Sequence, residues 1–285
     1  MPPQLITNVD SLRVAVHAAR REAKRIALVP TMGALHEGHL SLVRAAQEAC
    51  DFTVVSIYVN PSQFGPSEDF DKYPRTLDRD TDALAGCGVD LIFAPATDEV
   101  YRPGHATWVD VGSVAEPLEG QCRPGHFRGV ATIVLKLLNM VGPDAAFFGQ
   151  KDYQQAAVIR RMAAELDVPV EIVVCPTVRE PDGLAMSSRN AYLSPDARRQ
   201  ALVLWRSLCL ADELIGRGER NAQRIVGRME ELIRSAPDAR IDYVALVDPD
   251  TLASVETIRG TTLGVLAVRI GPTRLIDNRL LEPRT

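Results

Sequence analysis

The sequence predicts an α/β protein in which a parallel sheet covered by helices is followed by a smaller α+β domain. Apolar, β-branched segments alternate with amphipathic helical segments as far as residue 175, which is typical of repeated strand–helix units. The pattern then changes to a polar loop, two long helices and two strands. The length of 285 residues also exceeds what one ordinary core needs. We therefore expect one domain over residues 1–175 and a second over residues 176–285.

The first elements are read from apolar spacing. Helical spacing predicts a helix over 11–24, and an apolar run ending at a proline predicts a strand over 25–30. A glycine-containing loop over 31–38 precedes a helix over 39–49, whose apolar face carries Leu40, Val43 and Ala46. Further strands are expected at 52–59, 89–93, 145–148 and 170–174, and further helices at 77–85, 129–140 and 153–165. The second domain begins with a polar loop over 179–190, followed by helices at 195–216 and 221–234 and strands at 243–247 and 263–270.

Composition and charge are those of a globular protein. Hydrophobic residues make up 46% of the chain and charged residues 24%, far from a disordered composition. A formal charge of −5 offers no basic surface to offset a nucleic-acid backbone, so no nucleic-acid partner is expected. No apolar run is long enough to span a bilayer, and the N-terminal residues lack the pattern of a signal peptide. We expect a cytoplasmic protein with no membrane partner.

The cysteines argue against a disulfide framework and a zinc knuckle. There are five, an odd number, and none forms a CxxC pair. We expect reduced, mostly buried thiols at Cys50, Cys87, Cys122, Cys175 and Cys209.

The segment Pro30-Thr-Met-Gly-Ala-Leu-His-Glu-Gly-His39 lies between the first strand and a helix, and it suits a triphosphate. Gly33 permits a sharp turn, Gly38 permits close backbone approach, and the helix N-terminus offers unpaired N–H groups. His36 and His39 are placed to donate hydrogen bonds to charge that develops at the α-phosphate. The alternatives are helix capping and metal ligation, although HxxH lacks a third ligand at recognisable spacing. We assign no residue as a metal ligand.

A second segment, Tyr58-Val-Asn-Pro-Ser-Gln63-Phe, runs from a strand into an Asn-Pro turn. Gln63 is its informative residue, because an amide that both donates and accepts suits a substrate with a carboxylate and a hydroxyl. Tyr73 and Asp80 are possible further contacts. For Asp80 we favour the plainer interpretation of an exposed residue at the start of a helix.

Two more segments suit a nucleotide. In Phe148-Gly-Gln-Lys-Asp152, Gly149 would let a ribose approach the backbone, Asp152 would accept from ribose hydroxyls and Lys151 would meet phosphate. Gln155 lies one helical turn beyond Lys151 and would point toward the same cleft. In Met186-Ser-Ser-Arg189-Asn, two hydroxyls and a guanidinium on a loop can hold pyrophosphate. The alternatives are an exposed Lys-Asp pair at a helix start and a solvated linker.

These segments together resemble the pantothenate synthetase family in order and spacing. The resemblance rests on Val29–His39, Val59–Phe64, Tyr73–Thr76, Arg123–Val130, Phe148–Asp152 and Arg179–Asn190, which run from the first strand into the second domain. It implies the fold of the HxGH nucleotidyltransferases, with a Rossmann-like N-terminal catalytic domain that binds nucleotide and pantoate and a C-terminal lid domain. It also implies a homodimer.

The resemblance assigns site residues by motif. It implies that His39 is the proton-donating catalytic residue, with His36, Lys151 and Arg189 also catalytic. Gln63 and Gln155 would bind pantoate, and Gln63 would also lie near β-alanine. The implied ATP-binding residues are Met32, Gly33, Ala34, Leu35, His36, Glu37, Gly38, His39, Gly149, Gln150, Lys151, Asp152, Val178, Met186, Ser187, Ser188 and Arg189. No role follows from the sequence for His17, His105 or His126.

The activity implied is ATP-dependent condensation of pantoate with β-alanine through a pantoyl adenylate, with Mg²⁺ accompanying ATP. The rival within enzymes is an adenylyl- or cytidylyltransferase with a phosphorylated acceptor, which would need more cations in the acceptor pocket. A class I aminoacyl-tRNA synthetase shares HxGH, but the acidic balance and the lack of an RNA-binding appendage oppose it. A nucleotide-sensing protein without turnover remains the non-enzymatic alternative.

Overall fold

The computed structural model describes residues 2–66 and 68–283. They divide into two compact units, and each unit has its own sheet. The first unit comprises the chain up to Ala115, with Glu119–Gly149 and Gln155–Pro176. The second comprises Glu116–Leu118, Gln150–Gln154 and the chain from Thr177. Two short segments from within the first 175 residues thus group with the second unit, because their contacts are with it.

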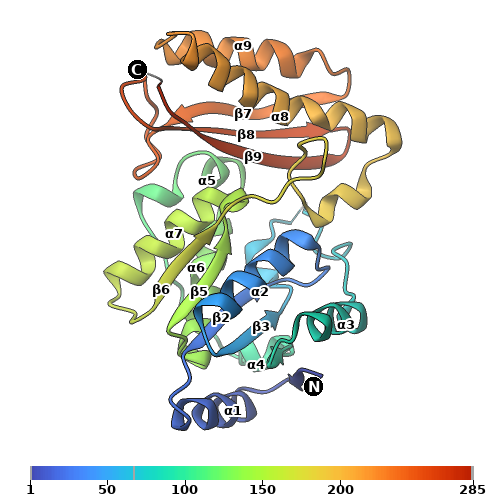
Figure 1. Cartoon of the computed structure of the whole chain (residues 1–285), viewed down its shortest axis with the longest axis vertical. Coiled ribbons are helices and arrows are strands. Elements are labelled where there is room, and N and C mark those ends of the chain that lie inside the picture. The colour runs from blue at the N-terminus through green and yellow to red at the C-terminus, as the bar shows by residue number, and fades with distance from the viewer. Residues whose placement is uncertain (1, 67, 284–285) are drawn as a thin grey trace. The chain divides into compact units, whose positions relative to one another are not determined.

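The first unit is built on a parallel sheet in the strand order β1-β4-β3-β2-β5-β6. Figure 1 labels β3, β2, β5 and β6 of this sheet. Within the described residues its strands are β1 (Gln4–Ile6), β2 (Ile26–Thr31), β3 (Phe52–Ile57), β4 (Leu91–Phe93), β5 (Ala145–Gly149) and β6 (Glu171–Cys175). Its longer helices are α1 (Val9–Arg21), α2 (Glu37–Ala49), α3 (Leu77–Cys87), α6 (His126–Val141) and α7 (Tyr153–Glu165). Short helical turns lie at α4 (Thr97–Val100), α5 (Glu119–Cys122), η1 (Pro61–Gln63) and η2 (Ser113–Ala115).

Helices cover both faces of this sheet, as the apolar strands predict. Ala27 and Val29 of β2 pack in a buried cluster with Val43 and Ala46 of α2. Since side chains alternate along a strand, the intervening Ile26 and Leu28, both fully buried, face the other side, where α1 and α6 contact β2. The sheet is therefore buried on both faces, and its strand ends are the places where polar chemistry can occur.

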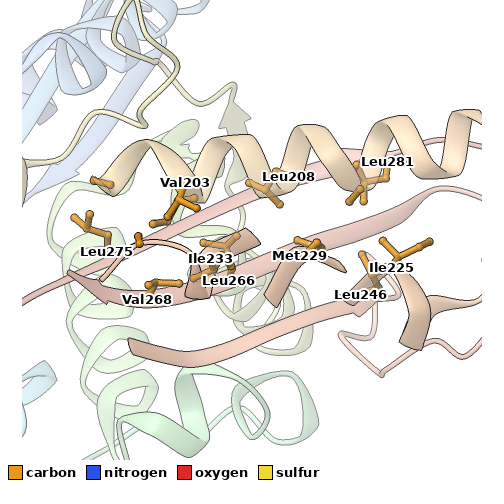
Figure 2. Packing of buried hydrophobic residues seen from close by; sticks show 14 of the residues in the cluster. Val203, Leu208, Ile225, Met229, Ile233, Leu246, Leu266, Val268, Leu275 and Leu281 are labelled. Atoms are coloured by element: carbon orange, nitrogen blue, oxygen red, sulfur yellow. The ribbon is translucent and has the colours of Figure 1, made fainter. Parts of the chain in front are cut away.

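The second unit is an antiparallel sheet with two helices. Strands β7 (Ala239–Val247), β8 (Thr262–Ile270) and β9 (Thr273–Leu281) pair in that order, and helices α8 (Pro195–Gly216) and α9 (Ala222–Arg234) precede them. The turns η3 (Gln150–Asp152) and η4 (Ser188–Tyr192) also belong to this unit. Figure 2 shows that Leu208 of α8, Met229 of α9 and Leu266 of β8 meet in one apolar layer. Both helices therefore cover the same face of the sheet.

Most predicted elements are confirmed, and the differences have local causes. The loop before α2 ends at His36, because that residue caps the helix, so α2 begins two residues earlier than predicted. Leu42 rather than Leu40 is buried on α2. Strand β9 was not predicted, since the charged and amide residues of Thr-Arg-Leu-Ile-Asp-Asn-Arg-Leu-Leu obscure its pattern.

The cysteines are all free, but the prediction that most are buried was wrong. Cys50 and Cys175 are buried, Cys87 and Cys209 are half-buried and Cys122 is exposed on the short helix α5. Among the helices of the described residues, none combines the length and apolar character required to cross a bilayer.

Candidate active site

The sheet of the first unit has one topological switch point, between β2 and β5. Successive crossovers place β3 and then β4 on one side of β2, whereas β5 and then β6 lie on its other side. Neighbouring parallel strands end at the same edge, so the loop after Thr31 and the turn after Gly149 leave adjacent strand ends. Ligands of open parallel sheets bind at such a point. Two of the three predicted nucleotide segments, Pro30–His39 and Phe148–Asp152, begin there.

The loop after β2 is held from beneath by a buried carboxylate. Gly33 and Ala34 have positive φ angles of 82° and 49°, so the backbone turns sharply after the strand. Asp80 of α3 accepts hydrogen bonds from the backbone N–H groups of Ala34 and Leu35, each at 2.9 Å. Its side chain also accepts from the hydroxyl of Thr76. Asp80 is 1% exposed, so the prediction of an exposed helix start was wrong: the carboxylate is buried because the loop supplies donors for it.

The two histidines form the N-terminus of α2, which follows this loop. His36 is the N-cap and its Nδ1 accepts from the backbone N–H of Gly38, while Nδ1 of His39 accepts from the N–H of His36. The ring centroids lie 4.1 Å apart. A nitrogen that accepts carries no proton, so the neutral form of each ring carries its proton on Nε2. Capping thus sets the tautomer of both imidazoles and leaves Nε2–H as the donor of each.

Gln63 is a predicted substrate residue that contacts this loop directly. Its Nε2 lies 3.1 Å from Sδ of Met32, in the loop after β2. Its Oε1 accepts from Nδ2 of Asn60, at 3.1 Å. Asn60 is 1% exposed and also donates to the carbonyl of Gly129 on α6. The Asn-Pro turn therefore does more than end the strand, because Asn60 orients the Gln63 amide.

The backbone of Gln63 is fixed by a buried polar group on α6 and the residues before it. Nδ1 of His126 lies 2.8 Å from the Gln63 carbonyl oxygen, and Nε2 lies 3.0 Å from Nη1 of Arg123. Nδ1 donates and Nε2 accepts, since a guanidinium only donates. Burial, with the nearby positive charge of Arg123, lowers the pKa of His126 to about 4. His126 is therefore neutral near pH 7.

Arg123 is itself neutralised. Its guanidinium forms two hydrogen bonds of 2.7 Å to the carboxylate of Glu68, and Glu119 lies 3.6 Å from it. Burial alone would raise the pKa of Glu68, but the hydrogen bond and charge of Arg123 lower it below its ordinary value. The positive charge of Arg123, which lies beside Gln63, is therefore balanced by the carboxylates of Glu68 and Glu119 in the same unit.

Gly129 allows α6 to approach the η1 turn that carries Gln63. A Cβ at this position would lie 2.3 Å from the carbonyl oxygen of Ser62 and 2.7 Å from the backbone nitrogen of Gln63. No side chain fits in that space. Glycine at position 129 therefore helps to set the distance between α6 and the η1 turn.

The second unit contains the remaining predicted ATP segments. Lys151 and Asp152 lie in η3, with Nζ of Lys151 3.7 Å from the Asp152 carboxylate. Val178 and Met186 face each other across a small hairpin, in which the Met186 N–H donates to the Val178 carbonyl at 3.0 Å. Ser187 caps η4 by accepting from the N–H of Arg189.

The structure distributes the predicted residues as follows. It brings together Met32 and Gln63, and it brings His36 next to His39. Gln155 is half-buried on the first turn of α7 and belongs to the first unit, although Lys151 belongs to the second. Tyr73 is 5% exposed and its ring meets Phe64 edge-on, so it contributes to packing.

Of the histidines left without a role, His17 is exposed on α1, and the His105 ring packs against Tyr101 and Trp108. Reasoning from sequence missed the supporting roles of Asn60, Glu68, Asp80, Arg123, His126, Asp277 and Asn278. The local signals were the motif-like stretches that contain Asn60, Arg123 and His126, and Asp80 was considered only as a possible substrate contact. Within residues 2–66 and 68–283, no cluster of three or more His, Cys, Asp or Glu side chains is arranged to hold a metal ion.

The family of the chain is decided by comparison with known proteins. A sequence model described as pantoate-beta-alanine ligase matches residues 4–280. The chain belongs to the pantoate-β-alanine ligase family. A relative from Moorella thermoacetica named pantothenate synthetase is 56% identical over 279 residues, covering 98% of this chain and 99% of the relative.

Solved structures of the family have the same fold. The pantothenate synthetase of Thermus thermophilus superposes with a TM-score of 0.94 at 46% identity, covering 98% of this chain and 100% of the other. The pantoate-β-alanine ligase of Francisella tularensis, solved in complex with beta-gamma ATP and β-alanine, superposes with a TM-score of 0.81 at 33% identity, covering 98% and 97%. The expected combination of a Rossmann-like parallel sheet with a smaller α+β part is thus confirmed.

Proposed function

We propose that this chain condenses pantoate with β-alanine at the expense of ATP, releasing pantothenate, AMP and pyrophosphate through a pantoyl adenylate. The observation that carries the proposal is the placement of a histidine-capped helix N-terminus at the switch point of the sheet, in a chain of the pantoate-β-alanine ligase family. A carboxylate is a poor acyl donor, so it must first be activated. The pantoate carboxylate attacks the α-phosphorus and pyrophosphate leaves; the β-alanine amine then attacks the acyl carbon and AMP leaves.

The residues proposed for ATP belong to both units. The first unit supplies the loop and helix start Met32–His39 together with Gly149, and the second supplies Gln150–Asp152, Val178 and Met186–Arg189. What supports the first set is chemistry: the start of a 13-residue helix at a strand end is a ready anion site. What supports the second is that it carries Lys151 and Arg189.

The two histidines act on the α-phosphate. With Nδ1 of each ring engaged in capping, the Nε2–H groups are the donors that can meet a phosphate oxygen. His39 donates to the charge that develops as pyrophosphate departs, and His36 supports it. The capping interpretation and the catalytic interpretation therefore concern different nitrogens of the same rings, and the two are compatible.

Pantoate is bound by Gln63 and Gln155, and Gln63 also lies near β-alanine. The support for Gln63 is its held position, since its side chain is oriented by Asn60 and its carbonyl by His126. An amide so held presents its remaining hydrogen-bonding capacity in one direction. A phosphorylated acceptor, as in a nucleotidyltransferase, would need free positive charge here, whereas Arg123 is paired with Glu68.

Lys151 and Arg189 stabilise the phosphates that leave. An ammonium and a guanidinium suit this role because charge accumulates on pyrophosphate as the bond to the α-phosphorus breaks. Mg²⁺ would accompany ATP as part of the substrate and would neutralise part of the phosphate charge. The oxygen-rich phosphates suit so hard an ion better than the histidines do.

A homodimer and a cytoplasmic location stay predictions. Light scattering on the purified chain tests the homodimer.

The decisive experiment measures pyrophosphate and AMP release from Mg-ATP with pantoate, with and without β-alanine. Pantoate alone should support pyrophosphate release and pantoate-dependent exchange of labelled pyrophosphate into ATP. AMP should form only when β-alanine is added. Absence of pantoate-dependent exchange, with release on phosphorylated acceptors instead, would replace the ligase by the nucleotidyltransferase.

A further inference from the structure

Two adjacent polar residues are buried in the edge strand β9 of the second unit. Asp277 and Asn278 are each 3% exposed, in a strand whose neighbours Leu275 and Leu281 belong to the apolar core. Burial of such groups costs free energy unless their hydrogen bonds are made. The hydrogen-bond partners of Asp277 and Asn278 therefore explain why two polar residues are tolerated in this strand.

Asn278 holds the turn that carries Lys151. Its Nδ2 donates to the backbone carbonyls of Gln150 and Lys151, at 2.9 Å and 2.8 Å. Its Oδ1 lies 3.4 Å from Nε2 of Gln150. One amide thus contacts three groups of a single three-residue turn, η3.

Asp277 holds the loop that carries Arg189. Its carboxylate accepts two hydrogen bonds from Arg179, at 2.7 Å and 2.9 Å. The same guanidinium donates to the Gly183 carbonyl and stacks on Trp205 at 3.8 Å. Burial raises the pKa of Asp277, and the Arg179 guanidinium opposes that rise. Arg179 pairs with Ala185 across the hairpin that Val178 and Met186 also form, so the Asp277–Arg179 contact holds the segment that leads into η4 and Arg189.

Both attachments are made by one strand. Side chains of adjacent strand residues point to opposite faces, so Asp277 and Asn278 attach one segment on each face of β9. The strand contacts η3 and η4 together. Consistently, Gln150–Gln154, which comprises η3 and the first two residues of α7, groups with the second unit although the flanking residues belong to the first. The two cations proposed for the phosphates are therefore mounted on a common support.

We propose that Asp277 and Asn278 are positioning residues for the phosphates of ATP, which hold the Lys151 turn and the Arg189 loop in one fixed arrangement. The inference rests on the proposed function, since it takes Lys151 and Arg189 as phosphate ligands. Neither β9 residue touches the reacting atoms. Each acts through a cation on a segment far away in the sequence.

The first test is Asn278→Ala, assayed by pantoate-dependent exchange of pyrophosphate into ATP. The KM for ATP should rise about tenfold, the loss expected when one or two neutral hydrogen bonds no longer order the turn. In the complete reaction with β-alanine, the KM values for pantoate and β-alanine should stay within about twofold of wild type, because Gln63 and its supports lie in the other unit. An unchanged KM for ATP would overturn the proposal.

The second test asks whether Asn278 acts through Lys151. In a Lys151→Ala background, Asn278→Ala should raise the KM for ATP no further, since there is no ammonium left to position. Likewise Asp277→Asn should have little added effect in an Arg189→Ala background. Fully additive effects in both cycles would mean that the β9 residues support stability alone, and would overturn the proposal.

Two control variants separate positioning from general weakening of the second unit. Asn221→Ala removes the N-cap of α9 and should lower the melting temperature without changing the KM for ATP. Asp242→Asn breaks another Asp–Arg pair of the same sheet, with Arg274, and should also leave that KM unchanged. A rise in KM in either control equal to that of Asn278→Ala would overturn the proposal.

Folding failure and failure of the ligase function are also distinguishable. If Asn278→Ala is not folded at the assay temperature, Asn278→Ser, which keeps one donor, should give a smaller rise in the KM for ATP, and no rise would overturn the proposal. If wild type shows no pantoate-dependent exchange, the ligase function fails, and Mg-ATP binding measured by calorimetry tests the inference instead. Asn278→Ala should then weaken binding about tenfold, and equal binding would overturn it.

Discussion

The carboxylate of Asp80 lies 2.9 Å from the backbone nitrogen of Ala34, a residue with a positive φ in the loop before the HxGH helix. The same side chain accepts from the backbone N–H of Leu35, which lies 45 residues earlier in the sequence. A buried anion thus occupies the inner side of the loop that leads to the proposed phosphate site. The shape of the loop depends on the two acceptor oxygens of Asp80.

Asp80→Asn should impair adenylate formation. The amide retains one acceptor oxygen and directs an NH₂ group at a backbone N–H, so one buried donor loses its partner at a cost of about 1–3 kcal/mol. We expect pantoate-dependent pyrophosphate exchange to fall roughly tenfold or more, on the basis of that cost. The matched control is Asp78→Asn, an exposed aspartate on the same turn of α3. Equal activity of the two variants would exclude the role of Asp80.

His39→Ala should slow the first half-reaction by roughly 10²- to 10³-fold, which is the usual loss when one preorganised donor to a developing charge is removed. Rapid-quench measurement of pyrophosphate release with pantoate isolates this step. The control is His17→Ala, since His17 is exposed on α1. Near-normal adenylate formation in His39→Ala would show that the ring serves only to cap α2.

Lys151→Ala should weaken the use of ATP, because the helix N-terminus cannot replace a side-chain ammonium beside the phosphates. We expect a higher KM for ATP and slower pyrophosphate release in steady-state assays at fixed pantoate. Lys24→Ala, which removes a surface lysine paired with Glu22, provides the comparison. Unchanged dependence on ATP would remove Lys151 from the site.

The parallel sheet could be predicted from the sequence, because it depends on local pattern. The site residues beside its glycine-containing turns were predicted from the same pattern, and their roles stay predictions. The sequence could not predict the residues that hold the site segments in place through hydrogen bonds. Asp80 reaches back to the loop before α2, His126 meets a carbonyl 63 residues earlier, and Asn278 binds a turn 127 residues earlier. Such contacts depend on topology. Strand β9 was missed for the same reason. Two buried polar residues, Asp277 and Asn278, interrupt its apolar pattern, and their partners are known only from the structure.

His126 should make stability depend on pH. In the unfolded chain this residue takes up a proton near its ordinary pKa of 6.5, whereas in the folded protein it does so only near about 4. Between these values the unfolded state binds more protons, so stability rises with pH and is lost as pH falls from about 6.5 toward 4. The shift corresponds to about 3 kcal/mol. Arg123, Glu119 and Glu68 are the charged groups that face the ring.

His126→Asn tests this dependence, because the amide can still donate to the Gln63 carbonyl but does not titrate. Urea unfolding at about pH 7 and about pH 5, on either side of the ordinary histidine pKa, should show a smaller loss of stability on acidification in the variant than in wild type. The exposed histidine provides the control, and His17→Asn should lose stability on acidification as wild type does. Parallel losses in all three proteins would contradict the depressed pKa of His126.

Gly129→Ala should both destabilise the first unit and disturb the substrate residue. The added methyl group would lie 2.3 Å from the Ser62 carbonyl oxygen, so α6 or the η1 turn must shift. We expect a loss of about 1–3 kcal/mol, the range for overpacking a close contact. Because η1 carries Gln63, the KM for pantoate should rise more than the KM for ATP.

The control for Gly129→Ala is Gly227→Ala on α9, where nothing lies within 4 Å of the new Cβ. That helix should gain about 0.5–1 kcal/mol, because alanine loses less conformational entropy than glycine when it enters a helix. Thermal melts and KM values for both variants decide the matter. If Gly129→Ala is as stable and as active as Gly227→Ala, the close approach of α6 does not set the position of Gln63.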